Sequence, residues 1–198
     1  ENIHILKNDM LAQLKQMERN SCVSLKDADI RQIDISAFFT SNDLIGLPLF
    51  VTQYVKTMLE IIQPATYTDL LKIYGFSHGT GVWIDNAKVM LERGHVLSDT
   101  IAFREDVMQY LVKKGVDLKD AFAIAEKVRI GRAQRQGFTS YESNIFEEHN
   151  VPSWYIRSMK KIGYLFPKSH AVEYMNIFLK MAWYKLYHPA AFYAAVNG

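Results

Sequence analysis

The chain has 198 residues, of which 49% are hydrophobic and 13% aromatic, a composition that indicates a folded globular protein and excludes a disordered one. Its single cysteine, Cys22, excludes an internal disulfide bond and a cysteine-based zinc site. The formal net charge is only +2, but residues 127–185 contain ten Lys or Arg against four Glu, so this region is either an ordinary solvated basic surface or one that meets a polyanion.

No signal peptide or membrane-spanning segment is expected. The first residues lack the charged and then apolar pattern of a signal peptide, and no run reaches about 18 apolar residues. Together with the single cysteine, this predicts a cytoplasmic protein that has no membrane partner. Because the chain begins with Glu1 and ends without a tail, we expect it to be a piece of a longer polypeptide.

Helical start and stop signals recur along the whole chain, and no segment alternates polar and apolar residues as a half-buried strand does. The sequence therefore predicts an all-α fold. In the first half, helices are expected over residues 3–18, 24–32, 48–63, 66–75 and 83–93. The second and fourth begin with the capping pairs Ser24 with Asp27 and Thr66 with Asp69. The third is bounded by prolines, and the last two end at a glycine.

In the second half, helices are expected over residues 103–113, 118–130, 152–163 and 167–188. Asp117 caps the second of these, and the last two start at Pro152 and Pro167. Residues 76–81 and 131–150 are predicted to be loops. The final helix carries only a narrow polar stripe, at residues 173, 176 and 180, so it is predicted to be mostly buried.

The start of this final helix is the first candidate site. The run Phe166-Pro167-Lys168-Ser169-His170-Ala171 brings a ring, a cation and a histidine to a helix N-terminus, where unpaired backbone donors and the helix dipole favour an anion. A base can stack on Phe166, and Lys168 can contact phosphate. Taken alone, these residues are more simply interpreted as a buried helix start with a solvated Lys168 and a packed His170.

Two other stretches have the composition of a phosphate site. The predicted loop Phe76–Trp83 combines glycines, hydroxyls and a histidine, and its backbone N–H groups can face a phosphate or simply form a turn between helices. Lys127, Arg129 and Arg132 lie at the end of a predicted helix, where cations either complement the helix dipole or bind a triphosphate or a DNA backbone.

No catalytic or metal-binding residue is predicted in this chain. Asp27 and Asp29 are two apart, as ligands on a metal-binding strand are, but on a helix they would point about 200° apart. The histidines have no ligand spacing, and neither a nucleophile triad nor a glycine-rich phosphate loop can be assembled. The residues alone therefore predict an all-α domain whose basic, aromatic C-terminal half suits a nucleotide or a nucleic acid.

Four stretches together carry a resemblance to one family. They are GFSHGTGVW at 75–83, FREDVM at 103–108, NVPSWYI at 150–156 and YLFPKSHA at 164–171. In order and spacing they resemble the PolC-type DNA polymerase III alpha subunit, the replicative polymerase of low-GC Gram-positive bacteria and their relatives. The resemblance extends from about Ile33 to the end of the chain.

The resemblance implies an irregular multi-helix fingers domain over residues 46–198, preceded by an N-terminal helical segment, residues 1–45, that connects to an upstream palm. The family's fingers close over the incoming deoxynucleoside triphosphate and the template base. The palm supplies the catalytic carboxylates and holds Mg²⁺, so this chain alone is predicted to be inactive and to bind no cofactor itself. The implied partners are a deoxynucleoside triphosphate, primer-template DNA and the remaining polymerase domains.

Carried over by motif, the resemblance implies a nucleotide pocket bordered by Phe166, Lys168 and His170, with Ser77 and His78 on the facing loop. The cations implied to neutralise the triphosphate are Arg104, Lys127, Arg129 and Arg132. For Arg104 the simpler interpretation is an ion pair with Glu105 or Asp106.

Three departures from the family pattern stand out. Gly81 takes the place of the usual Asp after Ser-His-Gly-Thr, and Ser169 replaces a usual Ala. Residues 131–150 form a longer segment that lacks the usual Lys-Gly-Lys-Gly run. Phosphate contacts from this last segment are therefore the least expected.

The alternative function is a stand-alone DNA-binding protein that uses the helices expected at 103–113 and 118–130 like a helix-turn-helix. The second of these is rich in alanine and has few side chains suited to reading base edges. A purely structural helical adaptor is a further alternative.

Overall fold

The computed structural model describes residues 9–41 and 43–197, and within them the chain forms twelve α-helices and no β-strand. The all-α prediction is confirmed. One isolated antiparallel bridge, between Thr80 and Tyr164, is the only β-type pairing in this part of the chain. None of the helices described combines the length and the apolar character that a bilayer crossing requires.

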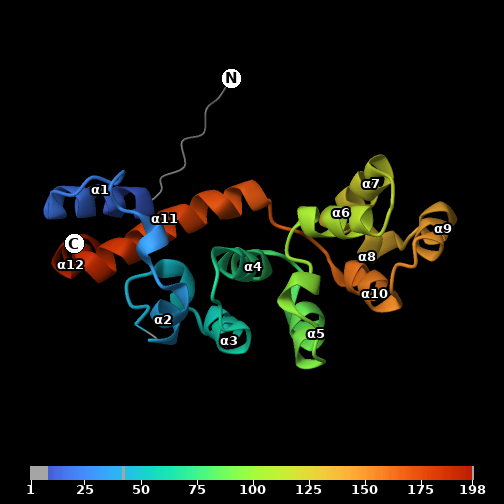
Figure 1. The fold of residues 1–198 in the computed structure, drawn as a ribbon, viewed down its shortest axis with the longest axis horizontal. Coiled ribbons are helices and arrows are strands. Elements are labelled where there is room, and N and C mark those ends of the chain that lie inside the picture. Colours follow the sequence, from blue (N-terminus) through green and yellow to red (C-terminus); the bar gives the residue numbers. More distant parts are fainter. Residues whose placement is uncertain (1–8, 42, 198) are drawn as a thin grey trace, which may run out of the picture.

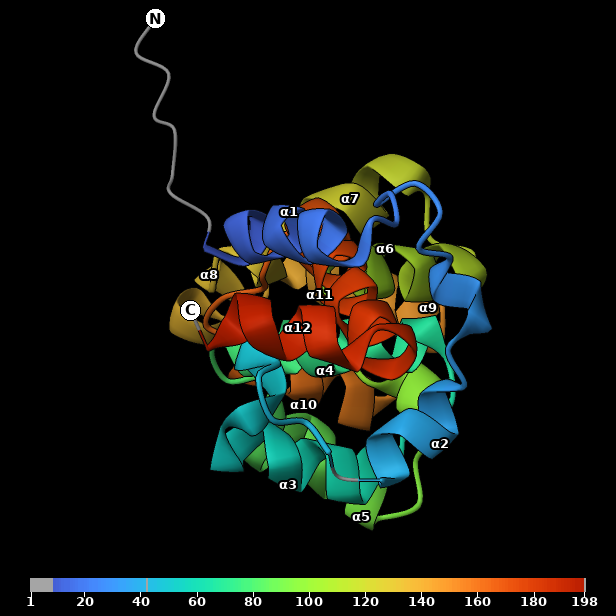
Figure 2. The same ribbon diagram turned by 90° about the vertical axis from the view of Figure 1, so that its left-hand side faces the viewer.

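The molecule is elongated, and α11 (Lys168–Tyr187) runs from its middle to one end (Figure 1). That end also holds α1 (Asp9–Ser21), α2 (Ile35–Thr40) and α12 (Pro189–Val196). Both views show α1 beside α12 (Figures 1 and 2), and these two helices pack against each other and against α11.

The middle of the molecule contains α3 (Gln53–Ile62), α4 (Tyr67–His78) and α5 (Lys88–Glu92), and α4 packs on both α3 and α11. The far end contains the remaining helices: α6 (Arg104–Lys113), α7 (Leu118–Arg129), α8 (Arg132–Gln136), α9 (Ser140–Glu148) and α10 (Ser153–Lys161). The start of α11 therefore lies in the middle of the molecule, between the helices of the two ends.

The first predicted helix is only partly described, because residues 3–8 lie outside the described residues. The rest of it forms α1, which buries Leu14 and Met17. The predicted helix over 24–32 is wrong. Ser24 Oγ accepts from the backbone of Lys26 in a turn, and only a 3₁₀-helix, Ile30–Gln32, follows, capped by Asp29. Short-range hydrogen bonds from Ser and Asp here favour turns over a continuous helix.

Two other boundaries differ from the prediction. The helix expected over 48–63 is divided at Thr52, whose extended backbone separates a 3₁₀-helix, Pro48–Val51, from α3. The helix expected to end at Gly75 continues to His78. A Cβ at Gly75 would lie 2.9 Å from the ring of Phe103, so this glycine permits close helix packing and does not terminate the helix.

In the second half, α6 and α7 form where the sequence predicts them. The loop predicted over 131–150 is wrong, since it contains α8 and α9. Thr139 and Glu142 form a reciprocal capping box that starts α9, and Ile145 and Phe146 bury its inner face. The helix α12 was also not predicted. Pro189 was interpreted only as the end of the preceding helix, but it also starts a new one.

Two lysines of α11 bond other parts of the chain, whereas Glu173 of the predicted polar stripe is exposed. The Nζ of Lys180 donates to the carbonyls of Leu25 and Ala28, and the Nζ of Lys185 donates to the backbone and carboxylate of Asp43. These bonds hold the segment that follows α1 against α11. The division of the chain at residue 45 stays a prediction.

Candidate functional site

A short extended segment, residues 163–166, is held between two helix ends. On one side, Leu165 N donates to the carbonyl oxygen of Arg129, at the end of α7, over 3.0 Å. On the other, Thr80 N donates to Tyr164 O at 2.9 Å and Thr80 O accepts from Gly163 N at 2.8 Å. The end of α7, the loop after α4 and the start of α11 are therefore joined through backbone hydrogen bonds.

Two glycines make these crossings possible. A Cβ at Gly81 would lie 2.1 Å from the carbonyl oxygen of Lys161, and a Cβ at Gly131 would lie 2.1 Å from that of Gly163. Both glycines also have left-handed φ angles, of +71° and +69°, which other residues rarely adopt. The backbone geometry of this chain therefore favours glycine at position 81, where the resembling family usually has Asp.

These crossings bring cations from three helices to one hollow of about 490 Å³. We call it the basic hollow, and its principal side chains are those of Arg104, Phe122, Glu126, Arg129, Phe166 and Lys168. Arg104 begins α6, Arg129 ends α7 and Lys168 begins α11. Cations that are more than 20 residues apart in the sequence thus meet at one place.

The carboxylate of Glu126 holds both guanidinium groups. Arg129 donates to its two oxygens over 2.8 and 2.6 Å, and Arg104 donates to one of them over 3.4 Å. The hydrogen bonds from Arg129, supported by Arg104, lower the pKa of Glu126 below its ordinary value. The expected pair between Arg104 and Glu105 is also present, at 3.0 Å. The two guanidinium groups are therefore held in place before any ligand binds.

Lys168 is the cation in the hollow that forms no ion pair with any described residue. It is half-buried, and its Nζ lies 5.9 Å from the ring centre of Phe103. Its charge is available to a ligand in the hollow, together with the exposed parts of Arg104 and Arg129, whose side chains are 34% and 30% exposed.

Behind the hollow, a buried lysine orients the start of α6. The carboxylate of Asp106 accepts from the backbone N–H groups of Ala102 and Phe103 at 2.8 and 3.0 Å. The Nζ of Lys72 donates to the same carboxylate at 3.4 Å and to the carbonyl of Thr100. Burial lowers the pKa of Lys72, although Asp106 opposes that shift. This network fixes the helix turn that carries Arg104.

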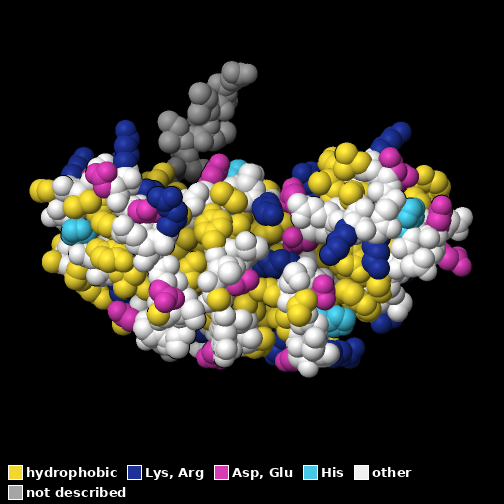
Figure 3. Space-filling view, viewed as in Figure 1, with side chains coloured by type: hydrophobic (Ala, Val, Ile, Leu, Met, Phe, Trp, Pro, Cys, Tyr) yellow, Lys and Arg dark blue, Asp and Glu magenta, His cyan; other side chains and the backbone are white. Residues whose placement is uncertain are grey.

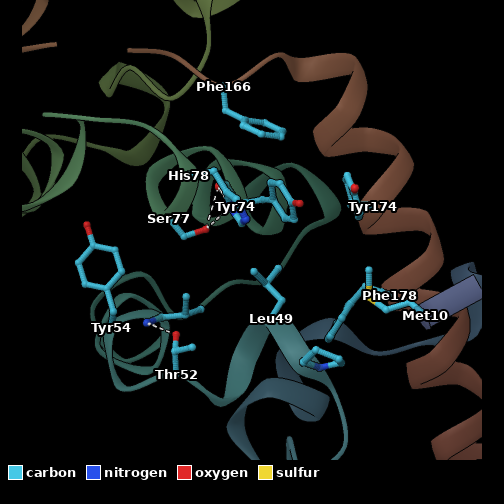
Figure 4. A pocket seen from close by; sticks show the side chains of 12 residues that line it. Met10, Leu49, Thr52, Tyr54, Tyr74, Ser77, His78, Phe166, Tyr174 and Phe178 are labelled. Carbon is cyan, nitrogen blue, oxygen red and sulfur yellow. Dashed lines mark hydrogen bonds between the residues drawn. The ribbon is translucent and has the colours of Figure 1, made fainter. Parts of the chain in front are cut away.

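An apolar cavity of about 660 Å³ adjoins the basic hollow, and Phe166 lines both. Figure 4 shows the ring of Phe166 above the stacked rings of Tyr74 and His78, whose centres are 4.1 Å apart. The centre of the Phe166 ring lies 5.2 Å from that of His78. Ser77 and His78 hydrogen-bond each other at 2.8 Å and also line the cavity. Burial raises the pKa of Tyr74 to about 12, so this side chain stays neutral.

The structure does not bring all predicted site residues together. Lys127 points away from the basic hollow and pairs with Glu142 of α9 at 2.5 Å. Arg132 is exposed on α8 and does not line the hollow. His170 is exposed in the first turn of α11, where its Nδ1 lies 3.5 Å from a carboxylate oxygen of Glu173. Their roles at a nucleotide site stay predictions.

Sequence reasoning missed the residues that organise the site. Glu126 was not singled out, although its place three residues before Arg129 on a predicted helix is a signal for an ion pair. Tyr74 and Phe122 were also missed. Tyr74 stacks on His78 one helical turn away, and the Phe122 ring lies 5.3 Å from the guanidinium of Arg104. Only the tertiary structure shows that these rings belong to the site.

The face of the molecule drawn in Figure 3 is not uniformly basic. In the view of Figure 3, Lys and Arg side chains are interspersed with Asp and Glu, with hydrophobic atoms exposed between them. Within the described residues, no three His, Cys, Asp or Glu side chains are grouped so that they could hold a metal ion.

Comparisons with known proteins complete these observations. The family model described as the bacterial DNA polymerase III alpha subunit finger domain matches residues 4–150. The DNA polymerase III PolC-type of Clostridium perfringens is 37% identical over 206 residues, which cover 96% of this chain and 14% of that protein. The PolC-type proteins of Caldanaerobacter subterraneus subsp. tengcongensis and Streptococcus sanguinis are 43% and 34% identical, over 82% and 98% of this chain. The chain spans 11% to 14% of the length of these relatives.

Proposed function

Because the chain belongs to the finger-domain family of the bacterial DNA polymerase III alpha subunit and is similar to PolC-type polymerases, we propose that it binds the incoming deoxynucleoside triphosphate and the primer-template DNA during DNA synthesis. The single observation that carries this proposal is the convergence of Arg104, Arg129 and Lys168 in one hollow beside Phe166. The groups that form the new bond would lie outside this chain, so the chain alone is proposed to be inactive.

The basic hollow suits the triphosphate. A nucleoside triphosphate carries roughly four negative charges, and three cations from three helices can approach its oxygens from different directions. Since Glu126 already fixes both guanidinium groups, little reorganisation is needed when the charge on the phosphates changes during the reaction. Lys168 adds a charge that no carboxylate of the described chain neutralises.

The ring of Phe166 suits the sugar or the base. It stands between the basic hollow and the apolar cavity, so a nucleotide whose phosphates occupy the hollow has its base near this ring. A base stacked on an aromatic side chain gains about 1–3 kcal/mol. Ser77 and His78, next to Phe166 in the wall of the cavity (Figure 4), offer hydrogen-bonding groups to a base edge.

Phosphoryl transfer in polymerases uses Mg²⁺, which offsets phosphate charge and activates the attacking oxygen. Since the chain spans only 11% to 14% of its PolC-type relatives, we propose that other domains hold Mg²⁺ and that this chain positions the nucleotide. Its location in the cytoplasm follows from the same proposal.

The alternative, a helix-turn-helix protein, has no observation in its favour. Its recognition helix would be α7, whose exposed large side chains are Leu118 and Phe122. Of its charged side chains, Glu126 and Arg129 are bound to each other, Lys127 is bound to Glu142, and Asp120 accepts from Tyr141, which leaves Lys119. A helix with this surface has few donors and acceptors for base edges.

The proposal is tested by equilibrium dialysis of radiolabelled dGTP against the chain. We expect Lys168→Ala and Arg129→Ala to raise the Kd about tenfold or more, because a hydrogen bond to a charged group contributes about 1.5–3 kcal/mol. Lys119→Ala is the matched control, since Lys119 is an exposed cation at the other end of α7. No binding by the wild type at millimolar dGTP, or equal Kd values for all four proteins, would reject the proposal.

A further inference from the structure

A third concave surface lies beside the apolar cavity. It has a volume of about 620 Å³ and is lined by Tyr54, Gly79, Gly81, Gln134, Lys160 and Lys161 among others. We call it the lysine groove. Ser77 and His78 line the apolar cavity whereas Gly79 and Gly81 line the groove, so the loop after α4 separates the two. Tyr54 lines both, which connects the groove through the cavity to Phe166.

The helices beside the groove carry only positive charge. α8 and α10 pack against each other, and neither contains an Asp or a Glu. Their five cations are all exposed, and none forms an ion pair with a described residue: Arg132, Arg135, Arg157, Lys160 and Lys161. Unneutralised cations on two adjacent helices create a local field that attracts a polyanion.

Asp85 is the one acidic residue among the described residues that line the groove. The Nζ of Lys161 donates to the main-chain carbonyl of Asp85 and not to its carboxylate. Gln134 Nε2 donates to the carbonyl of Lys161 at 3.0 Å, which ties α8 to the end of α10. The Nζ of Lys160 lies 5.9 Å from the ring centre of Phe138. Neither lysine forms an ion pair with a described residue, so their charge is not cancelled.

The groove also exposes groups that suit unpaired bases. Tyr54 is 41% exposed and Ile84, at the same groove, is 61% exposed. Aromatic and apolar side chains beside a cationic groove are the combination that binds single-stranded nucleic acid, since the cations follow the backbone and the bases stack. A duplex keeps its bases paired and offers them no such contact.

We propose that the lysine groove binds single-stranded DNA, with Lys160 and Lys161 on the phosphates and Tyr54 and Ile84 on the bases. The proposal deepens the proposed function. It rests on that function only where it identifies the bound strand as the unpaired template that leads to the nucleotide site. Binding of the strand itself depends only on the groove.

The test is a fluorescence anisotropy titration of a fluorescein-labelled 16-nucleotide oligo(dT) with the chain, at several salt concentrations. The variant is the double substitution Lys160→Gln and Lys161→Gln. The matched control is Lys113→Gln with Lys114→Gln, an adjacent lysine pair at the end of α6 that does not line the groove. We expect the Kd of the first variant to rise on the order of tenfold and its dependence on log salt to become shallower by about 1.4, that is, about 0.7 for each lost phosphate contact.

Several outcomes would overturn the proposal. They are no binding of the oligonucleotide by the wild type, an equal loss in the two double variants, or an unchanged salt dependence. Tighter binding of a 16-base-pair duplex with the same dependence on both lysines would reject the single-strand assignment. Replacement of both lysines by arginine should preserve binding, which guards against a misfolded variant. The Kd for dGTP should be unchanged in the variant with both lysines replaced by glutamine. The groove proposal and the nucleotide proposal can therefore fail independently of each other.

Discussion

Replacing Gly131 with alanine tests whether the backbone crossing between α7 and residues 163–166 assembles the basic hollow. The new Cβ would lie 2.1 Å from the carbonyl oxygen of Gly163, so the two segments must separate by about 1 Å. The hydrogen bond from Leu165 N to Arg129 O crosses the same junction. We expect that bond to weaken and Arg129 to move relative to Phe166 and Lys168.

The magnitude can be divided into two parts. Alanine in a left-handed conformation costs about 1–2 kcal/mol, and forcing an extra methyl group into a packed site costs about 1–3 kcal/mol more. For a chain of this size each kcal/mol lowers the Tm by about 2–4 °C, so the total of about 2–5 kcal/mol should lower the Tm of Gly131→Ala by about 4–20 °C. Gly94→Ala is the matched control, because Gly94 has φ +87° and nothing lies within 4 Å of its Cβ position. It should lower the Tm by only about 2–8 °C.

Scanning calorimetry of both variants gives the two Tm values, and dialysis at a temperature where both are folded gives the Kd for dGTP. We expect Gly131→Ala to bind dGTP more weakly than Gly94→Ala, since only the first displaces a wall of the hollow. Equal losses of Tm, or an unchanged Kd in Gly131→Ala, would refute the reasoning.

Two further predictions concern carboxylates. Glu126→Gln should lower the free energy of unfolding by about 1 kcal/mol in urea denaturation at pH 7, a small effect because all three partners are about a third exposed. Because the pKa of Glu126 is lowered, its contribution to the free energy of unfolding is complete above its ordinary pKa of 4.5 and is lost as the pH falls below that value. A variant as stable as the wild type at pH 7 would contradict the ion pairs of Glu126 with the two arginines. Burial alone would raise the pKa of Glu142, but hydrogen bonds from Lys127 and Thr139 outweigh it and lower the pKa. Glu142→Gln should therefore cost about 2 kcal/mol at pH 7, less at acidic pH, and speed amide exchange across α9; unchanged exchange there would show that the capping box does not hold this helix.

Local signals in the sequence located much of the fold. The capping pair Thr66 and Asp69 forms as predicted and starts α4, because capping uses residues that are close in sequence. Glycines were harder to interpret. Gly75 lies inside a helix against Phe103, whereas Gly131 and Gly81 permit backbone crossings. What each glycine approaches is set by distant parts of the chain, which local patterns do not contain.

The candidate site was likewise only partly predictable from the sequence. Phe166, Lys168, Arg104 and Arg129 were all identified from motifs, and the structure places them together. Lys127 was grouped with Arg129, yet residues two apart on a helix point about 200° apart, and Lys127 faces α9 instead. Helix geometry alone could have separated these two cations, but the pairing of Glu126 with Arg104 needed the packing of α6 on α7.

The most direct test of the central claim is an NMR titration of the isotopically labelled chain with dGTP, followed by backbone amide shifts. If a triphosphate occupies the basic hollow, the largest shifts will cluster at residues 103–105, 126–130 and 165–169, which are far apart in sequence and adjacent in space. Saturable shifts confined to any other surface, with these three segments unchanged, would contradict the account.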